Sequence, residues 1–177
     1  VPAILQQSGF ELQAVRTHTQ HGLDVVALEK QIKVARTFHP DRLLVLYCIP
    51  THHNPLGVSL SQATRIQLIQ LCETHGVYLI ADEVYHGLTF PLLSDDNEKN
   101  IATQPPPQPL SAMVTLSSLS SQYVISVSAF TKILCPGIRC GWIHTRNQNL
   151  LQRMRQDGVL DSGGCTSHLS SGIVSAL

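Results

Sequence analysis

The stretch from Ser128 to Trp142 reads SAFTKILCPGIRCGW and places one lysine, Lys132, in a loop between two apolar runs. The runs are Tyr123–Val127 and Gly141–His144, and their length and flanking turn residues are typical of short buried strands. Lys132 is therefore expected at the end of a strand, where ligand sites commonly form.

A second cation, Arg139, follows Lys132 seven residues later, and a Pro136-Gly137 turn folds the backbone between them. Both cations are thus expected to face one pocket. A lysine in a loop is commonly solvated, and its position alone favours that interpretation. However, the apolar neighbours Ile133 and Leu134 predict partial desolvation, which disfavours the ammonium form. The neutral amine is the nucleophile that Schiff-base chemistry needs.

Three motifs occur along the chain in the order typical of one enzyme family. The first is HNPLG at His53–Gly57, and the second is ADEVY at Ala81–Tyr85. The third combines three short pieces, Ala129–Lys132, Pro136–Arg139 and Gly141–Trp142. Together they resemble the signature of the fold-type I, pyridoxal-phosphate-dependent class I/II aminotransferases. Residues 139–142 and 158–164 resemble a subgroup near the 2-aminoadipate-type transaminases.

The resemblance implies an α/β fold, with a mainly parallel sheet and helices on both faces. Residues 1–177 would be part of the large domain that binds pyridoxal 5'-phosphate, with an N-terminal segment and the C-terminal small domain absent. By the same resemblance the intact enzyme is a homodimer that acts on an amino acid and a 2-oxo acid. The isolated 177 residues are expected to be inactive, to bind the cofactor weakly and to expose apolar surface.

Lys132 and Asp82 would carry the chemistry. By resemblance Lys132 is the Schiff-base lysine and then the general base at the substrate Cα. Asp82 follows the apolar run Val77–Ala81, so we expect it at the carboxyl end of a buried strand, where open parallel sheets bind ligands. A carboxylate there would keep the cofactor ring nitrogen protonated, and the alternative is that Asp82 caps a turn. Glu83 is expected to point elsewhere and to be structural.

Tyr85 and Asn54 would both donate hydrogen bonds to the phenolic oxygen of the cofactor, by resemblance. The alternative for Tyr85 is a buried tyrosine bonded to a backbone carbonyl. The alternative for Asn54 is a plain β-turn, because an Asn-Pro-x-Gly sequence alone indicates no more than that.

Arg139 would hold the cofactor phosphate through a fork of hydrogen bonds. The chain departs from the family at Ala129, where a hydroxyl is usual. Thr131 or Ser128 is the candidate to replace that hydroxyl as a cofactor-binding residue.

Composition excludes several classes of protein. Twelve basic and twelve acidic residues give no net charge, so neither nucleic acid nor an anionic membrane is expected as a partner. The five cysteines form no CxxC pair and predict reduced thiols in a cytoplasmic protein, with organellar targeting left open. Cys135 and Cys140 are interpreted as small apolar fillers.

The adjacent residues His52 and His53 are expected to point opposite ways on an extended loop, so no metal site is predicted.

Alternating strand and helix patterns predict the α/β class from the residues themselves. The strands Leu43–Cys48, Val77–Ala81 and Tyr123–Val127 are expected to be covered on both faces. The remaining elements expected are a strand at Gly9–Arg16, a helix from Val25 to about Thr37, a helix from Ser61 to Gly76 with the apolar stripe Ile66, Leu68, Ile69 and Cys72, a surface helix at Asn147–Gln156 with Leu150, Leu151 and Met154 inward, a helix within 167–177 and a long surface loop over 91–122.

Three functions remain open at this point. The first is an aminotransferase with pyridoxal phosphate as cofactor. The second is a carbon-sulfur lyase with the same cofactor, and the third is the effector-sensing domain of a transcription regulator built on the same fold. The amino-acid substrate is not predicted, because the carboxylate-binding arginine of the family lies in its small domain.

Overall fold

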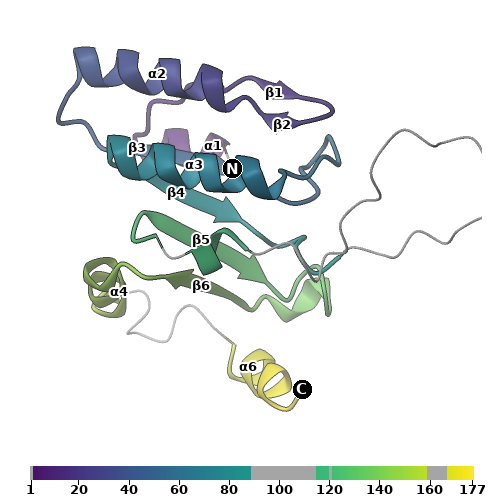
Figure 1. Ribbon diagram of the computed structural model, residues 1–177. Helices are drawn as coiled ribbons and strands as arrows, with labels where there is room; N and C mark the ends of the chain where they lie inside the picture. Colours follow the sequence, from purple (N-terminus) through teal and green to yellow (C-terminus); the bar gives the residue numbers. More distant parts are fainter. Residues whose placement is uncertain (1, 89–114, 120, 159–166) are drawn as a thin grey trace, which may run out of the picture.

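The computed structural model describes residues 2–88, 115–119, 121–158 and 167–177 (Figure 1). Its elements, in chain order, are α1 (Pro2–Gln7), β1 (Thr17–His18), β2 (Gly22–Leu23), α2 (Val25–Phe38), β3 (Leu44–Cys48), α3 (Gln62–His75), β4 (Val77–Asp82), the 3-10 helix η2 (Leu116–Leu119), β5 (Val124–Ala129), the 3-10 helix η3 (Pro136–Ile138), β6 (Gly141–Thr145), α4 (Gln148–Arg155) and α6 (His168–Ser175).

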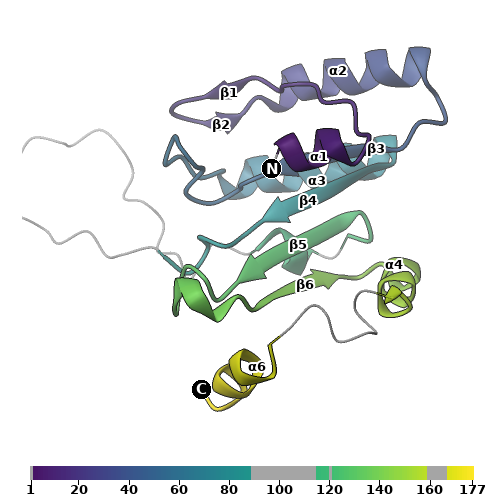
Figure 2. The same cartoon turned by 180° about the vertical axis from the view of Figure 1, so that it is seen from behind.

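The main sheet has the strand order β3-β4-β5-β6 among the described residues. Strands β3, β4 and β5 are parallel, and β6 returns antiparallel to β5. Figures 1 and 2 show the arrows of β4 and β5 pointing to the same end of the sheet. The predicted α/β class with a mainly parallel sheet is therefore confirmed.

Local signals set the ends of the two long helices as predicted. Asp24 caps α2, since its Oδ1 accepts a hydrogen bond from the Ala27 amide at 2.9 Å. Ser61 caps α3 in the same way through the Thr64 amide. Gly76 ends α3 in the left-handed region, with φ at 62°, where a residue without Cβ is least strained.

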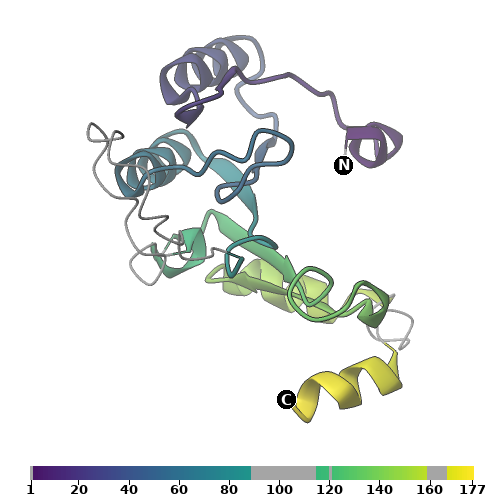
Figure 3. The same ribbon diagram turned by 90° about the vertical axis from the view of Figure 1, so that its right-hand side faces the viewer.

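The core lies between the sheet and the two long helices, with α3 packed on the sheet and α2 packed on α3 (Figure 3). Along β4 buried and half-buried residues alternate, and β3 shows a similar alternation. Within the described residues only one face of these strands is fully covered, so their coverage on both faces stays a prediction that depends on other parts of the protein. The face toward α3 is buried, and the opposite face carries half-buried side chains such as Tyr47 and Tyr78.

Two expectations are corrected. Residues 10–16 form no strand: Phe10 and Leu12 are 44% and 39% exposed, and strand pairing begins only at Thr17. In α3 the buried stripe includes Arg65 and Leu71, whereas the predicted Ile66 is 41% exposed. The helix phase is thus rotated from the predicted one, and it carries a cation into the core.

The predicted loop over 91–122 lies mostly outside the described residues. Its described end forms η2, and Leu116 there is fully buried in the core. This end is therefore not a surface loop.

The last strands and helices lie close to their predicted ranges. Strand β5 extends to Ala129 because it pairs with β6 as far as Gly141. Asn147 caps α4 rather than lying within it, and Leu150, Leu151 and Met154 are half-buried as expected. No helix among the described residues has the length and hydropathy that a membrane span requires.

Candidate functional site

Asp82 is the last residue of β4 and lies at the carboxyl end of the parallel strands, as predicted. Its Oδ2 accepts a hydrogen bond of 2.5 Å from the hydroxyl of Tyr47 on the neighbouring strand β3. Its Oδ1 is buried and has no hydrogen-bond partner among the residues that the structure describes. A buried carboxylate oxygen without a donor is unfavourable, so this atom is suited to accept from a ligand.

Glu83 follows Asp82 and is buried, with a structural role as predicted. Its carboxylate accepts from the Leu116 amide at 2.8 Å and from the Ser126 hydroxyl. It therefore joins η2 to β5 behind the sheet edge. The pleat separates the two acidic side chains, which leaves Asp82 toward the half-buried face.

Lys132 lies in a tight turn after β5. The Leu134 amide bonds to the Phe130 carbonyl at 2.8 Å, and the Phe130 amide bonds to the Cys140 carbonyl at 3.0 Å. The turn holds the Lys132 Nζ 5.8 Å from the ring centroid of Tyr85, which follows β4. Two predicted site residues from separate motifs are thus neighbours, at a cation-π distance.

The expected desolvation of Lys132 is not observed. Its side chain is exposed, and its apolar neighbours Ile133 and Leu134 are 48% and 43% exposed. Ile138, a further apolar residue of this loop, is buried. Apolar residues beside a lysine desolvate it only if they pack over it, and here they point to solvent.

The same loop carries two further candidates, Thr131 and Arg139. Arg139 ends η3 with φ at 48°, a left-handed conformation that is uncommon outside glycine, and its side chain is exposed. Thr131 is half-buried. Cys135 is exposed and Cys140 half-buried, so the prediction that both are apolar fillers is wrong for Cys135. The ring of Phe130 packs on Trp142 at 4.8 Å between centroids, and this contact holds the two ends of the loop together.

Asn54 lies exposed in a short loop whose ends are bonded to each other. The His53 amide donates to the Val58 carbonyl, and the Leu60 amide donates to the Pro50 carbonyl. The loop begins directly after β3, so the motif that contains Asn54 lies at the same end of the sheet as Asp82.

Arg65 holds the base of this loop from inside the core. Its side chain is fully buried and donates to the Leu60 carbonyl at 3.0 Å, the Pro50 carbonyl at 2.9 Å and the Thr51 hydroxyl at 2.8 Å. Burial lowers the pKa of Arg65 from its ordinary value, and the nearby Glu83 carboxylate opposes that shift. Burial likewise lowers the pKa of His86, which lies beside the same carboxylate.

The sequence motifs do not predict two residues of the site. The run Leu43–Cys48 predicts only an apolar strand, and the register that pairs Tyr47 with Ile80 brings Tyr47 close to Asp82, two residues further along β4. No sequence signal marks Arg65, since a cation is rarely buried without a partner. The signal for Tyr47 is its hydroxyl within an otherwise apolar run.

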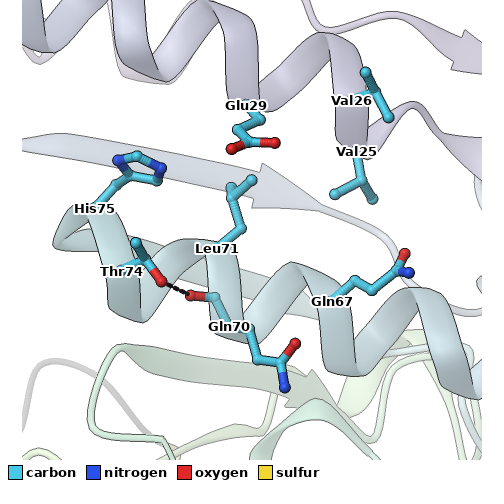
Figure 4. Close-up of a pocket in the computed structure, with 8 residues that line it drawn as sticks. All are labelled: Val25, Val26, Glu29, Gln67, Gln70, Leu71, Thr74 and His75. Carbon is cyan, nitrogen blue, oxygen red and sulfur yellow. Dashed lines mark hydrogen bonds between the residues drawn. The ribbon is translucent and has the colours of Figure 1, made fainter.

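The described ranges contain no group of three or more His, Cys, Asp and Glu side chains that could hold a metal ion. An open groove lies between α2 and α3, away from the predicted site residues (Figure 4). It is lined by Val25, Val26, Glu29, Gln67, Gln70, Leu71, Thr74 and His75.

Comparison with known proteins gives a family match over the whole chain. Residues 1–177 match the family model described as aminotransferase class I and II. The aminotransferase swnA of Arthroderma benhamiae is 30% identical over 148 residues, which cover 79% of this chain and 29% of the relative. An uncharacterized HTH-type transcriptional regulator of Bacillus subtilis, YcxD, is 34% identical over 123 residues, which cover 70% of this chain and 22% of the relative.

Among solved structures, the aminotransferase Aro8 from Candida albicans superposes with a TM-score of 0.66 at 26% identity. The superposition covers 88% of this chain and 33% of that one. The chain thus spans about a third or less of the length of these proteins.

Proposed function

This chain belongs to the class I and II aminotransferase family, and from that premise we propose that the protein moves an amino group between an amino acid and a 2-oxo acid, with pyridoxal 5'-phosphate as cofactor. The observation that carries the proposal is the buried Oδ1 of Asp82, an acceptor without a donor among the described residues at the ligand-binding edge of the sheet.

The residues present fit that cofactor. A pyridinium N–H needs a carboxylate oxygen, and the free Oδ1 of Asp82 supplies one. Lys132 offers an amine beside Tyr85, and Arg139 offers a guanidinium on the same loop. When bound, the cofactor supplies an electron sink for the bond that breaks at the substrate Cα.

We assign each side chain a role that its position permits. Lys132 holds the cofactor through its amine and then carries a proton from and to the substrate Cα. Asp82 keeps the ring nitrogen protonated. Tyr85 and Asn54 donate hydrogen bonds to the phenolic oxygen.

Arg139 and Thr131 bind the phosphate, and Thr131 takes the place of the hydroxyl that Ala129 lacks. Since the cations of the 131–139 loop are exposed in this chain, water must be excluded by parts outside these residues. A second copy of the protein is the candidate, because the family resemblance implies a homodimer. Residues 1–177 would then be part of the cofactor-binding domain.

The test uses the full-length protein, because these residues cover only part of each relative. Incubated with pyridoxal 5'-phosphate, it should develop a visible absorption band. Borohydride reduction should remove that band and leave the cofactor attached to Lys132, as located by mass spectrometry. Lys132→Ala should abolish both the band and amino-group transfer, whereas Lys30→Ala on the exposed surface of α2 should change neither.

Attachment at another lysine, or no band, would contradict the proposal. An HTH-type regulator is also similar to this chain, over 70% of its length, so the transfer assay also separates an enzyme from a regulator domain. A protein that binds the cofactor and turns over no amino acid would have to be reconsidered as a sensor.

A further inference from the structure

Tyr47 and Asp82 lie on neighbouring parallel strands and on the same face of the sheet. Tyr47 is level with Ile80, and Asp82 is two residues further along β4, so both side chains project to the half-buried face. Their hydrogen bond of 2.5 Å is short, as expected when a hydroxyl donates to an ionised carboxylate.

This bond makes the two carboxylate oxygens of Asp82 different from each other. Oδ2 is occupied by the Tyr47 hydroxyl, while Oδ1 is buried without a donor among the described residues. A carboxylate can rotate about its last bond, and a donor on one oxygen restricts that rotation. The free oxygen is then presented in one direction.

The tyrosine is a dependable donor. Its burial, and next the bond to Asp82, raise the pKa of Tyr47 well above its ordinary value. The phenol thus keeps its proton at any pH at which the protein would be studied.

We propose that Tyr47 is a positioning residue: it holds Oδ2 of Asp82 so that Oδ1 meets the ring nitrogen of the cofactor. This inference rests on the proposed function. It gives strand β3 a role in cofactor binding through Tyr47, a residue that lies outside all three sequence motifs.

The experiment compares two cofactors on the full-length apoprotein. One is pyridoxal 5'-phosphate, and the other is 1-deazapyridoxal 5'-phosphate, in which a carbon-hydrogen group replaces the ring nitrogen. Tyr47→Phe should weaken binding of the first about tenfold, the equivalent of about 1.4 kcal/mol. It should leave binding of the second within about twofold, because that cofactor has no N–H for Asp82 to accept.

Two controls define the mechanism. Tyr78→Phe removes a hydroxyl from the same face of the sheet, from a ring that packs on Tyr123 at 5.5 Å, and it should affect neither cofactor. In an Asp82→Asn background, Tyr47→Phe should cause no further loss of affinity, because the carboxylate through which it acts is gone.

Equal weakening of both cofactors would show that Tyr47 only supports the fold, and the inference would be wrong. No weakening of either would also overturn it. If the unmutated protein fails to bind pyridoxal 5'-phosphate at all, the proposed function fails with it. If it binds that cofactor but Tyr47→Phe does not distinguish the two, only the positioning role is lost.

Discussion

Arg65 is a fully buried cation that ties the base of the Asn54 loop, and its replacement by methionine should loosen that loop. Methionine has a similar length and cannot donate a hydrogen bond. The carbonyl of Pro50 would keep its bond from the Leu60 amide, but the Leu60 carbonyl and the Thr51 hydroxyl would lose the donors that the structure gives them.

The size of the effect follows from those two groups. Each buried polar group left without a partner costs about 1–3 kcal/mol, which gives about 4 kcal/mol for the pair. Burying the charged guanidinium is itself unfavourable, and its Nη1 has no hydrogen-bond partner among the described residues. Removing it therefore recovers part of the free energy of unfolding that the two lost hydrogen bonds cost. We expect a net loss of about 3 kcal/mol, which corresponds to a change of roughly 150-fold in an opening equilibrium.

Hydrogen exchange followed by mass spectrometry measures this opening locally, in the full-length protein. The peptide that contains residues 51–60 should exchange about a hundredfold faster in Arg65→Met, because the amides of His53, Gly57 and Leu60 are bonded within this loop. Arg153→Met, on an exposed position of α4, is the matched control and should leave the peptide unchanged. Exchange within about threefold of the unmutated protein would refute the reasoning, since it would mean a cost below about 0.7 kcal/mol.

Three further predictions concern the site and its surroundings. Asp82→Asn should slow amino-group transfer by orders of magnitude, and a loss of less than about tenfold, or about 1.4 kcal/mol of barrier, would make Asp82 only a structural cap. Burial lowers the pKa of His86, so the folded state binds fewer protons than the unfolded chain as pH falls below about 6.5, and stability should decrease there. The melting temperature should therefore fall less between pH 7 and pH 5.5 in His86→Gln, and an identical fall would contradict this. Iodoacetamide should label the exposed Cys135 in the native protein and spare Cys48 and Cys72, because burial raises the pKa of both thiols to about 12; labelling of all three at similar rates would count against the packing described.

The helix ends were predictable because their causes are local. Asp24, Ser61 and Asn147 each accept a hydrogen bond from an amide three residues later, so the signal and its effect lie within one turn. The left-handed residue at Gly76 is equally local. Such features depend little on the rest of the chain. Asp24, Ser61 and Gly76 lie where they were predicted, whereas Asn147 was expected within its helix and caps it instead.

Burial of the strands depends on more than the local sequence. Apolar runs such as Leu44–Cys48 indicate a strand, but which of its faces is covered depends on the elements that pack against it. In the described residues α3 covers one face, and Val45 on the other is exposed. The same dependence explains Lys132, whose apolar neighbours could have covered it and do not.

The order and spacing of the motifs were enough to predict the fold class and the family, both of which are confirmed. They also nominate Lys132, Asp82, Tyr85, Asn54, Thr131 and Arg139, whose roles stay proposals. These inferences need only residues close together in the chain, or a pattern that many proteins share.

Only the tertiary structure decided which side chains meet. Tyr47 and Asp82 are 35 residues apart and become bonded because β3 and β4 pair in one particular register. Arg65 reaches Pro50 and Thr51 because α3 packs with that face toward the core, and Glu83 reaches Leu116 across 33 residues. Register and helix phase are set by the packing of the whole core, since a slip of one residue in a strand turns every side chain to the opposite face.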